Sequence, residues 1–168
     1  MGLLDSKGRW QVDPGNIDGI ILEYFGSIFK SNEPAKFEAS LSAIHPKVTL
    51  AMNATLAANF RAEEVWIALQ QMHPTKSPGP DSMSPIFYQK YLDVVGRNVT
   101  DCVLNTLNTR VMPPGLNETF ICLIPKVKSP QKITEFRPIS LCNVSYKIIS
   151  KVLANQLKKI LADVINES

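Results

Sequence analysis

The sequence predicts a mainly α-helical protein of the α+β class with one small antiparallel β-hairpin. Five segments repeat apolar residues at helical spacing, and the last of them extends for about twenty residues. Two short segments rich in β-branched and aromatic residues follow each other in the chain, which predicts paired strands. Hydrophobic residues make up 45% of the 168 and charged residues 20%, a composition typical of a globular chain and not of a disordered one.

The first third of the chain predicts one helix and a linker. Residues 17–30 carry apolar side chains on one helical face, which indicates an amphipathic helix. Residues 31–60 begin with Ser-Asn-Glu-Pro, a helix-breaking sequence, and show few periodic positions. We therefore expect a loose linker between residue 30 and the next helix.

Three helices are predicted after the linker. Residues 61–72 repeat apolar positions on one face and predict the first of them. Ser84 and Pro85 supply an N-cap and a first-turn proline for the second, which we expect Gly96 to break. The third is predicted over residues 98–110 and ends before a Pro-Pro-Gly sequence.

The rest of the chain predicts the hairpin and the clearest helix. Residues 119–125 read as a strand, and residues 133–139 can return as its antiparallel partner. Pro138 is suited only to an edge or a terminus, because it lacks the N–H that a central strand needs. From Val144 to Val164 the apolar residues follow helical spacing, which predicts a strongly amphipathic last helix.

Composition argues against several classes of protein. No apolar run approaches the ~20 residues that a bilayer span needs, and the N-terminus lacks the layout of a signal peptide, so we expect an intracellular protein that binds no membrane. The three cysteines are odd in number and form no C-x-x-C pair, which argues against a disulfide framework or a zinc site. His45 and His73 lie far from any cysteine or carboxylate cluster, so we predict no catalytic or metal-binding triad.

Residues 75–81, Thr-Lys-Ser-Pro-Gly-Pro-Asp, predict a stiff exposed loop. Its two prolines fix φ and lack N–H donors, while Gly79 frees the turn. The loop presents Lys76 on a rigid scaffold, which could hold a nucleic-acid backbone. The alternative is an ordinary turn between helices, in which Asp81 bonds the local backbone.

Two further groups of cations could bind phosphate. Lys126 follows the first strand and Arg137 lies near the end of the second, so antiparallel pairing could bring both to one face of the hairpin, where they could bind a triphosphate. The alternative is a solvated edge on which lysine discourages further strand pairing. On the last helix a polar row advances by four, four and three residues and could follow a phosphate backbone, although a plain solvated face is the alternative. The row consists of Lys147, Lys151, Asn155 and Lys158.

Three motifs resemble the first conserved blocks of reverse transcriptases from plant LINE-type, non-LTR retrotransposons. They are, in chain order, KSPGPDSMSPIFYQKY, FICLIPKV and FRPISLCNVSYKIISKVLANQLKKIL. The resemblance covers about Asn59 to the end of the chain. The preceding sequence, GLLDSKGRWQVDPGNIDGIILEYFGSIF, is similar to the region between the endonuclease and reverse-transcriptase domains of such polyproteins. On this basis residues 1–58 are a linker region with an amphipathic helix, and residues 59–168 are a reverse-transcriptase fingers segment.

The resemblance implies a right-hand polymerase of which this chain supplies part of the fingers and not the palm. The implied partners are an RNA template, an RNA/DNA duplex and, in the intact enzyme, a nucleoside triphosphate; self-association through the apolar surface that would face the palm is a further expectation. Family analogy implies nuclear residence. The implied nucleotide-phosphate contacts are Lys126 and Arg137, and the implied template contacts are Lys76, Pro78, Gly79, Pro80, Asp81, Lys147 and Lys151.

The same resemblance implies that the chain does not polymerise alone. Polymerases of this kind use two divalent metal ions, Mg²⁺ in the intact enzyme, held by palm aspartates in motifs that this sequence does not contain. We therefore assign the chain no catalytic residue, no metal ligand and no cofactor of its own. Two departures from the family are Ser82, where members usually have Gly, and Arg61, where they commonly have a Thr or Ser helix cap. The alternatives are a non-catalytic protein-interaction module and a transposon relic without selected function.

Overall fold

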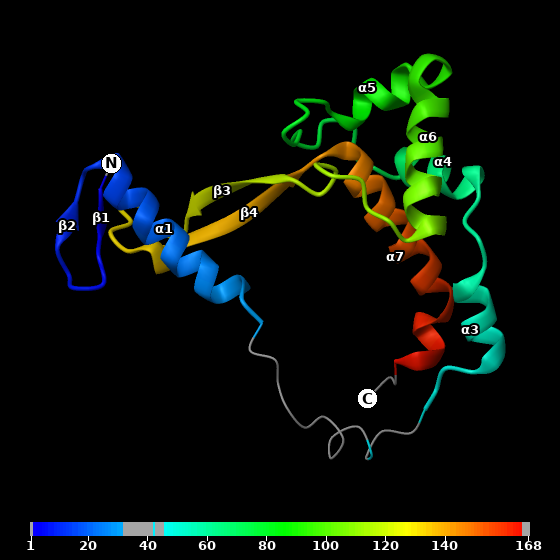
Figure 1. Ribbon diagram of the computed structural model, residues 1–168, viewed down its shortest axis with the longest axis horizontal. Coiled ribbons are helices and arrows are strands. Elements are labelled where there is room, and N and C mark those ends of the chain that lie inside the picture. Colours follow the sequence, from blue (N-terminus) through cyan, green and yellow to red (C-terminus); the bar gives the residue numbers. More distant parts are fainter. Residues whose placement is uncertain (1, 32–41, 43–45, 166–168) are drawn as a thin grey trace. The chain divides into compact units, whose positions relative to one another are not determined.

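The computed structural model describes residues 2–31, 42 and 46–165 and confirms the predicted fold class. About 54% of the described residues are helical, and the described strands form two antiparallel sheets of two strands each (Figure 1). The chain divides into two compact units, which we describe separately. Unit 1 consists of residues 1–44 and 121–139, and unit 2 of residues 45–120 and 140–168.

Unit 1 joins the beginning of the chain to the hairpin region. Strands β1 (Leu3–Leu4) and β2 (Trp10–Gln11) pair in antiparallel register, Leu3 opposite Gln11. Helix α1 (Pro14–Phe29) follows; the Asp13 carboxylate caps it by accepting the Asn16 N–H at 3.2 Å, and Pro14 occupies the first turn. The core of this unit is formed by Leu3, Phe25, Ile133 and Phe136, which are all buried.

The core of unit 1 joins two distant parts of the chain, while the predicted division of the chain after residue 58 stays a prediction. Ile133 and Phe136 pack with Leu3 and Phe25, and the Leu4 N–H donates to the Gln131 carbonyl at 2.8 Å. Residues 121–139 therefore group with residues 1–44, although they lie far along the chain. The functions assigned to the regions 1–58 and 59–168 stay predictions.

Unit 2 is a helical unit built around α7 (Val144–Val164). Helices α4 (Ala62–Gln70) and α6 (Leu92–Thr109) pack on α7 and on each other, and α3 (Leu50–Ala57) lies against α7 (Figure 1). Helix α5 (Pro85–Lys90) packs on α4 and α6. The core consists of Val65, Ala68, Leu69, Met72, Val103, Val144, Ile148, Ile149 and Val152. The predicted amphipathic last helix is confirmed.

Helix α3 lies within the segment predicted as a loose linker, which corrects that prediction. Thr49 begins the helix, and its Oγ1 accepts the Met52 N–H at 3.2 Å. The Gln156 side chain, buried on α7, donates to the Thr55 carbonyl at 3.2 Å. The helix is thus stabilised by a cap and by tertiary contact, and residues 32–41 and 43–45 of the predicted linker lie outside the described residues.

Gly96 does not break a helix. The helical backbone is interrupted at Tyr91, where φ is −110° and ψ 34°, and α6 then runs through Gly96 to Thr109. Gly96 is buried, and a Cβ there would lie 3.0 Å from the Leu92 side chain. Glycine adopts helical dihedral angles like other residues, so its presence weakened the helix without ending it.

The hairpin strands are β3 (Thr119–Pro125), as predicted, and β4 (Phe136–Cys142), which starts three residues later than expected. Residues Ile133–Glu135 form a 3₁₀ turn instead. The Glu135 carboxylate closes this turn by accepting the N–H groups of Gln131 at 2.7 Å and Lys132 at 3.2 Å. A local side-chain bond to the backbone thus competes with strand formation.

Candidate nucleic-acid interface

The predicted rigid loop is irregular, as expected, and is attached to the start of α7 through Gly79. Gly79 is buried, and a Cβ at this position would overlap the backbone of Cys142 and Asn143. The glycine is therefore needed for close approach of two backbones, whereas the sequence suggested freedom of the turn. The loop is packed on the junction between β4 and α7.

The Asn143 side chain also fixes the loop to the start of α7. Its Oδ1 accepts the Asp81 N–H at 3.0 Å, and its Nδ2 donates to the Gly115 carbonyl at 3.4 Å. Asn143 precedes α7 but makes no side-chain cap bond to that helix. Sequence reasoning missed this residue, because an Asn before a strong helix predicts a local cap and not a contact with a loop 62 positions earlier.

Asp81 itself makes the local bond that the plainer alternative requires. Its Oδ1 accepts the Met83 N–H at 3.1 Å, and Ser82 between them has a φ of 57°, in the left-handed region. Pro78 is exposed, whereas Pro80 and Asp81 are half-buried. The loop is thus shaped by its own turn bond and fixed by Asn143, while its template contacts stay predictions.

Lys147 connects α7 to the loop. Its Nζ donates to the Ser77 carbonyl at 2.6 Å. Burial lowers the pKa of this lysine and the Lys76 cation lowers it further, while Cys142 and the Asp81 carboxylate oppose them. Lys147 thus uses one of its three N–H donors to bond the backbone of the loop.

Three of the predicted template lysines line one groove of unit 2. Lys76 from the loop and Lys147 and Lys151 from α7 surround a space of about 630 Å³. No Asp or Glu lies among the described residues that line it. The other lining residues are polar or apolar: Gln71, Met72, His73, Ser140, Cys142, Tyr146, Ser150 and Ala154. A concave surface with three cations and no acid attracts anions.

Lys126 and Arg137 belong to unit 1, and both are exposed. The Lys126 N–H donates to the Glu135 carbonyl at 2.8 Å, which sets Lys126 across the hairpin from Glu135. Because strand side chains alternate and Phe136 is buried, Arg137 points away from the core. The Lys126 ammonium, however, donates to the Thr134 carbonyl at 2.8 Å. The triphosphate role of the pair stays a prediction.

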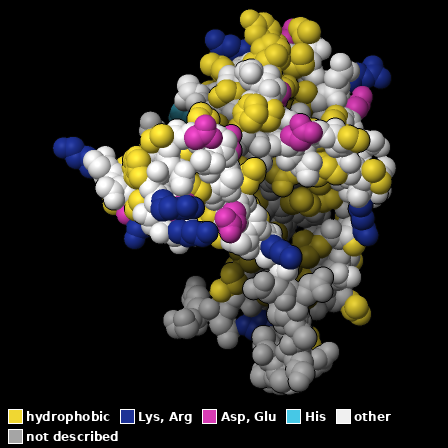
Figure 2. Space-filling view, turned by 60° about the vertical axis from the view of Figure 1, so that its left-hand side comes forward, with side chains coloured by type: hydrophobic (Ala, Val, Ile, Leu, Met, Phe, Trp, Pro, Cys, Tyr) yellow, Lys and Arg dark blue, Asp and Glu magenta, His cyan; other side chains and the backbone are white. Residues whose placement is uncertain are grey.

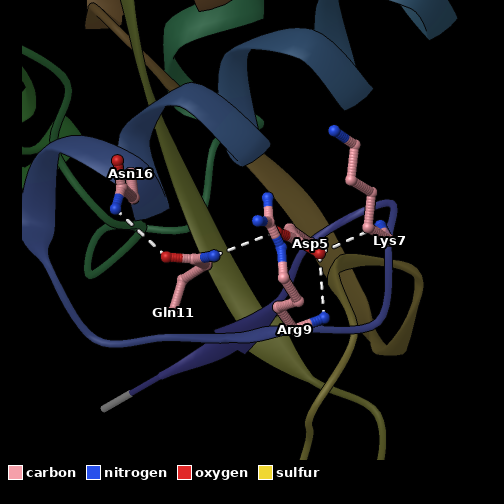
Figure 3. A network of polar contacts seen from close by, with 5 residues as sticks. All are labelled: Asp5, Lys7, Arg9, Gln11 and Asn16. Carbon is pink, nitrogen blue, oxygen red and sulfur yellow. Dashed lines mark hydrogen bonds and ion pairs between the residues drawn. The ribbon is translucent and has the colours of Figure 1, made fainter.

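The Asp5 carboxylate in unit 1 accepts several hydrogen bonds that hold the local backbone (Figure 3). Asp5 accepts the N–H groups of Lys7 and Arg9 at 2.9 Å each, the Arg9 Nε at 3.0 Å and the Gln11 Nε2 at 2.9 Å. These bonds, the backbone bond of Arg9 foremost, lower the pKa of Asp5 to about 2. Sequence reasoning did not single out Asp5, which closes the turn between β1 and β2.

The described part of the chain contains neither a metal-binding cluster nor a helix that could span a membrane. No group of three or more His, Cys, Asp or Glu residues there is placed to hold a metal ion. None of the described helices is long and apolar enough to cross a bilayer. Cys102, Cys122 and Cys142 are free thiols.

Hydrophobic side chains reach the surface widely. On the face drawn in Figure 2 they occur among neutral side chains and small groups of both basic and acidic side chains. In unit 2 the exposed large apolar residues include Trp66 on α4 and three leucines on α7. These exposed apolar side chains therefore offer a surface to which a partner with apolar groups could bind.

Comparison with known proteins connects the chain with a transposon. No family model matches the sequence. Over 104 residues, 62% of the chain, it is 31% identical to a protein described as transposon TX1 uncharacterized 149 kDa protein from Xenopus laevis. The chain spans only 8% of the length of that relative. The chain is thus similar, over more than half its own length, to a small part of a transposon protein.

Proposed function

We propose that this chain is a segment of a retrotransposon reverse transcriptase, the fingers part, which contacts template–primer and incoming nucleotide and does not polymerise alone. The resemblance of three motifs to plant LINE-type enzymes supports this, and so does the similarity to a Xenopus transposon protein. The observation that carries the nucleic-acid contact is the groove lined by Lys76, Lys147 and Lys151, with no Asp or Glu among the described residues that line it.

The groove combines an ordered loop with three lysine cations, which suits a phosphate backbone. The loop is already ordered by Gly79 packing and the Asn143 bond, so binding need not order it. Lysines neutralise phosphates and release counterions, which makes affinity fall with salt by a logarithmic slope of about 0.9 per contact on B-DNA. The contacts carry no base specificity, so we propose backbone binding without sequence preference.

The test is a fluorescence anisotropy titration of the whole chain against a labelled RNA/DNA primer–template duplex at two salt concentrations. The variant Lys76→Gln/Lys151→Gln removes two groove cations and leaves the Lys147–Ser77 bond in place. We expect weaker binding and a salt slope lower by about 2, one for each lost contact.

A matched control removes the same charge elsewhere. Lys7→Gln/Lys90→Gln takes away two exposed cations that do not line the groove. We expect its affinity and salt slope to stay close to those of the wild-type chain. Equal losses in both double variants would mean that net charge alone drives binding, and the proposal for the groove would fail.

The proposed nucleotide contact has its own test. Lys126→Gln/Arg137→Gln should weaken binding of a fluorescent nucleoside triphosphate and leave duplex binding through the groove in place. Arg supplies a planar fork and Lys a point charge, so Arg137→Lys should recover only part of the affinity. Unchanged triphosphate binding in the double variant would contradict this role.

A further inference from the structure

A row of exposed leucines on α7 stands apart from the lysine groove. Leu153, Leu157 and Leu161 follow each other at four-residue spacing, so they lie one above the other on one side of the helix. Their exposed fractions are 47%, 47% and 37%, whereas Ile149, four residues before Leu153 in the same row, is buried in the core of unit 2. The leucines thus continue the apolar stripe of α7 beyond the part that the core of unit 2 covers.

The leucine row opens into a groove of about 430 Å³. Leu153 and Leu157 form one side of it, and Leu56, Phe60 and Leu107 contribute from α3, from the segment after it and from α6. Leu161 continues the row one turn beyond the groove. The geometry matches the helix-in-groove mode of recognition, in which a partner helix places apolar anchors at three- or four-residue spacing.

The charges that border the row are positive. Of the described residues that line the groove, Arg110 alone is charged, and it is exposed. Lys158 directly follows Leu157 and lies about 100° further around the helix, with Lys151 two turns earlier on the same side. No Asp or Glu lines the groove among the described residues. One cation therefore lies at the groove and another beside the row on α7.

We infer that the leucine row of α7 is a docking site for an amphipathic helix with acidic residues along its flanks. Its apolar anchors bury Leu153, Leu157 and Leu161, and its carboxylates face Arg110 and Lys158. A second copy of this chain fits less well: a twofold dimer places the same patch against itself, and the lysine rows then meet. This inference does not depend on nucleic-acid binding.

The test uses two synthetic helical peptides that share the same leucine face. One carries Glu on both flanks and the other carries Lys, and fluorescence polarisation measures the binding of each to the whole chain. We expect the Glu peptide to bind at least about tenfold more tightly. Equal binding of the two peptides, or no binding of either, overturns the inference.

Variants of exposed residues locate the site. Leu153→Gln/Leu157→Gln should weaken the Glu peptide roughly tenfold or more, whereas Leu22→Gln on α1, 73% exposed in the wild type, should leave it unchanged. Arg110→Glu/Lys158→Glu should reverse the preference toward the Lys peptide. Circular dichroism checks that each variant keeps its helix content. If the affinity of the Glu peptide is the same for these variants as for the wild-type chain, the peptide binds elsewhere and the inference is wrong.

Self-association is measured in parallel by sedimentation equilibrium. If the chain forms dimers that Leu157→Gln abolishes, the occupant of the row is a second copy, and the acidic-helix inference is wrong. If the chain stays monomeric while the Glu peptide binds, the inference holds.

Discussion

At the scale of single residues, Gly79 is the position that tolerates a side chain least. A Cβ there would overlap the backbone of Cys142 and Asn143, and backbone cannot move aside as a flexible side chain can. We expect Gly79→Ala to lower the free energy of unfolding by about 1–3 kcal/mol, the usual cost of overpacking, and to loosen the loop. Urea unfolding measures the first effect and amide exchange of Asp81 the second.

The control for Gly79 is a helical glycine with free space. A Cβ on Gly19 would meet nothing within 4 Å, and α1 is a regular helix there. Gly19→Ala should therefore raise the free energy of unfolding by about 0.5–1 kcal/mol. If both alanine variants behave alike, the close approach at Gly79 does not limit the fold.

Replacing Ser82 by glycine should stabilise the protein. Its φ of 57° is a conformation that side-chain-bearing residues adopt at a cost, and glycine adopts it freely. We expect Ser82→Gly to raise the free energy of unfolding by about 0.5–1 kcal/mol, because relief of strain exceeds the added freedom of the unfolded chain. Urea unfolding checks this, with Ser84→Gly, at a φ of −98°, as the control that should bring no gain.

Asp5 makes the first hairpin sensitive to acid. Its pKa is lowered from an ordinary 3.8 to about 2 by the bonds from Arg9, Gln11 and Lys7. A lowered pKa in the fold means that this stabilisation is complete above about pH 4 and is lost as the pH falls through 2. A pH titration of the Arg9 amide by NMR should show the loss, and Asp5→Asn should remove that pH dependence.

At the scale of elements, α4 lacks a proper N-terminal cap. Arg61 occupies the cap position, makes no side-chain cap bond and places a cation at the positive end of the helix dipole. The Glu64 carboxylate already accepts the Arg61 N–H at 3.1 Å, which is half of a capping box. The Glu64 N–H donates to the Arg61 carbonyl at 3.1 Å, and the hydroxyl of Arg61→Ser would share this donor. We expect a gain of about 1 kcal/mol in urea unfolding followed by Trp66 fluorescence.

A second variant separates the two causes at this position. Arg61→Ala removes the cation without supplying a hydroxyl that could accept the Glu64 N–H. We expect it to bring only the few tenths of a kcal/mol due to the helix dipole. A full gain from alanine would mean that charge, and not capping, limits the start of α4.

Elements were predictable where periodicity was strong. The last helix and strand β3 follow from their apolar patterns, and their bounds agree with the structure. Helix α3 escaped prediction because none of its residues is buried, so it has no apolar stripe to reveal it. Its signal was Thr49, a cap residue in front of a weak pattern. Gly96 misled for the converse reason, since tertiary packing carries α6 through it.

At the scale of the whole molecule, each unit has a core that can be tested separately. Phe25 is buried in unit 1 and Val103 in unit 2. We expect Phe25→Ala, at a usual cost of about 3–5 kcal/mol, to reduce hydrogen-exchange protection mainly in residues 2–30 and 121–139. Val103→Ala should do so mainly in α4, α6 and α7. Equal loss throughout the chain in both variants would mean that the two units unfold as one.

The sequence indicated the lysines of the candidate site but not the contacts that bring them together. Spacing placed Lys147 and Lys151 on one side of α7, and composition made the loop of Lys76 stiff. That the three lysines share a groove depends on Gly79 and Asn143, whose contacts join distant parts of the chain. Such contacts leave no periodic trace in a single sequence, because periodicity reports neighbours within one element.

The bond from Lys147 to the Ser77 carbonyl has a consequence for the order in which the protein assembles. The two residues are 70 positions apart, and the Asp81–Asn143 bond spans 62. Contacts across such distances require large loops to close first, so they form late and slow the folding of a chain that is otherwise rich in local helix. The lysine groove is therefore a product of completed folding: a peptide cut from the loop alone cannot reproduce it, and a nascent chain does not possess it until α7 has been made.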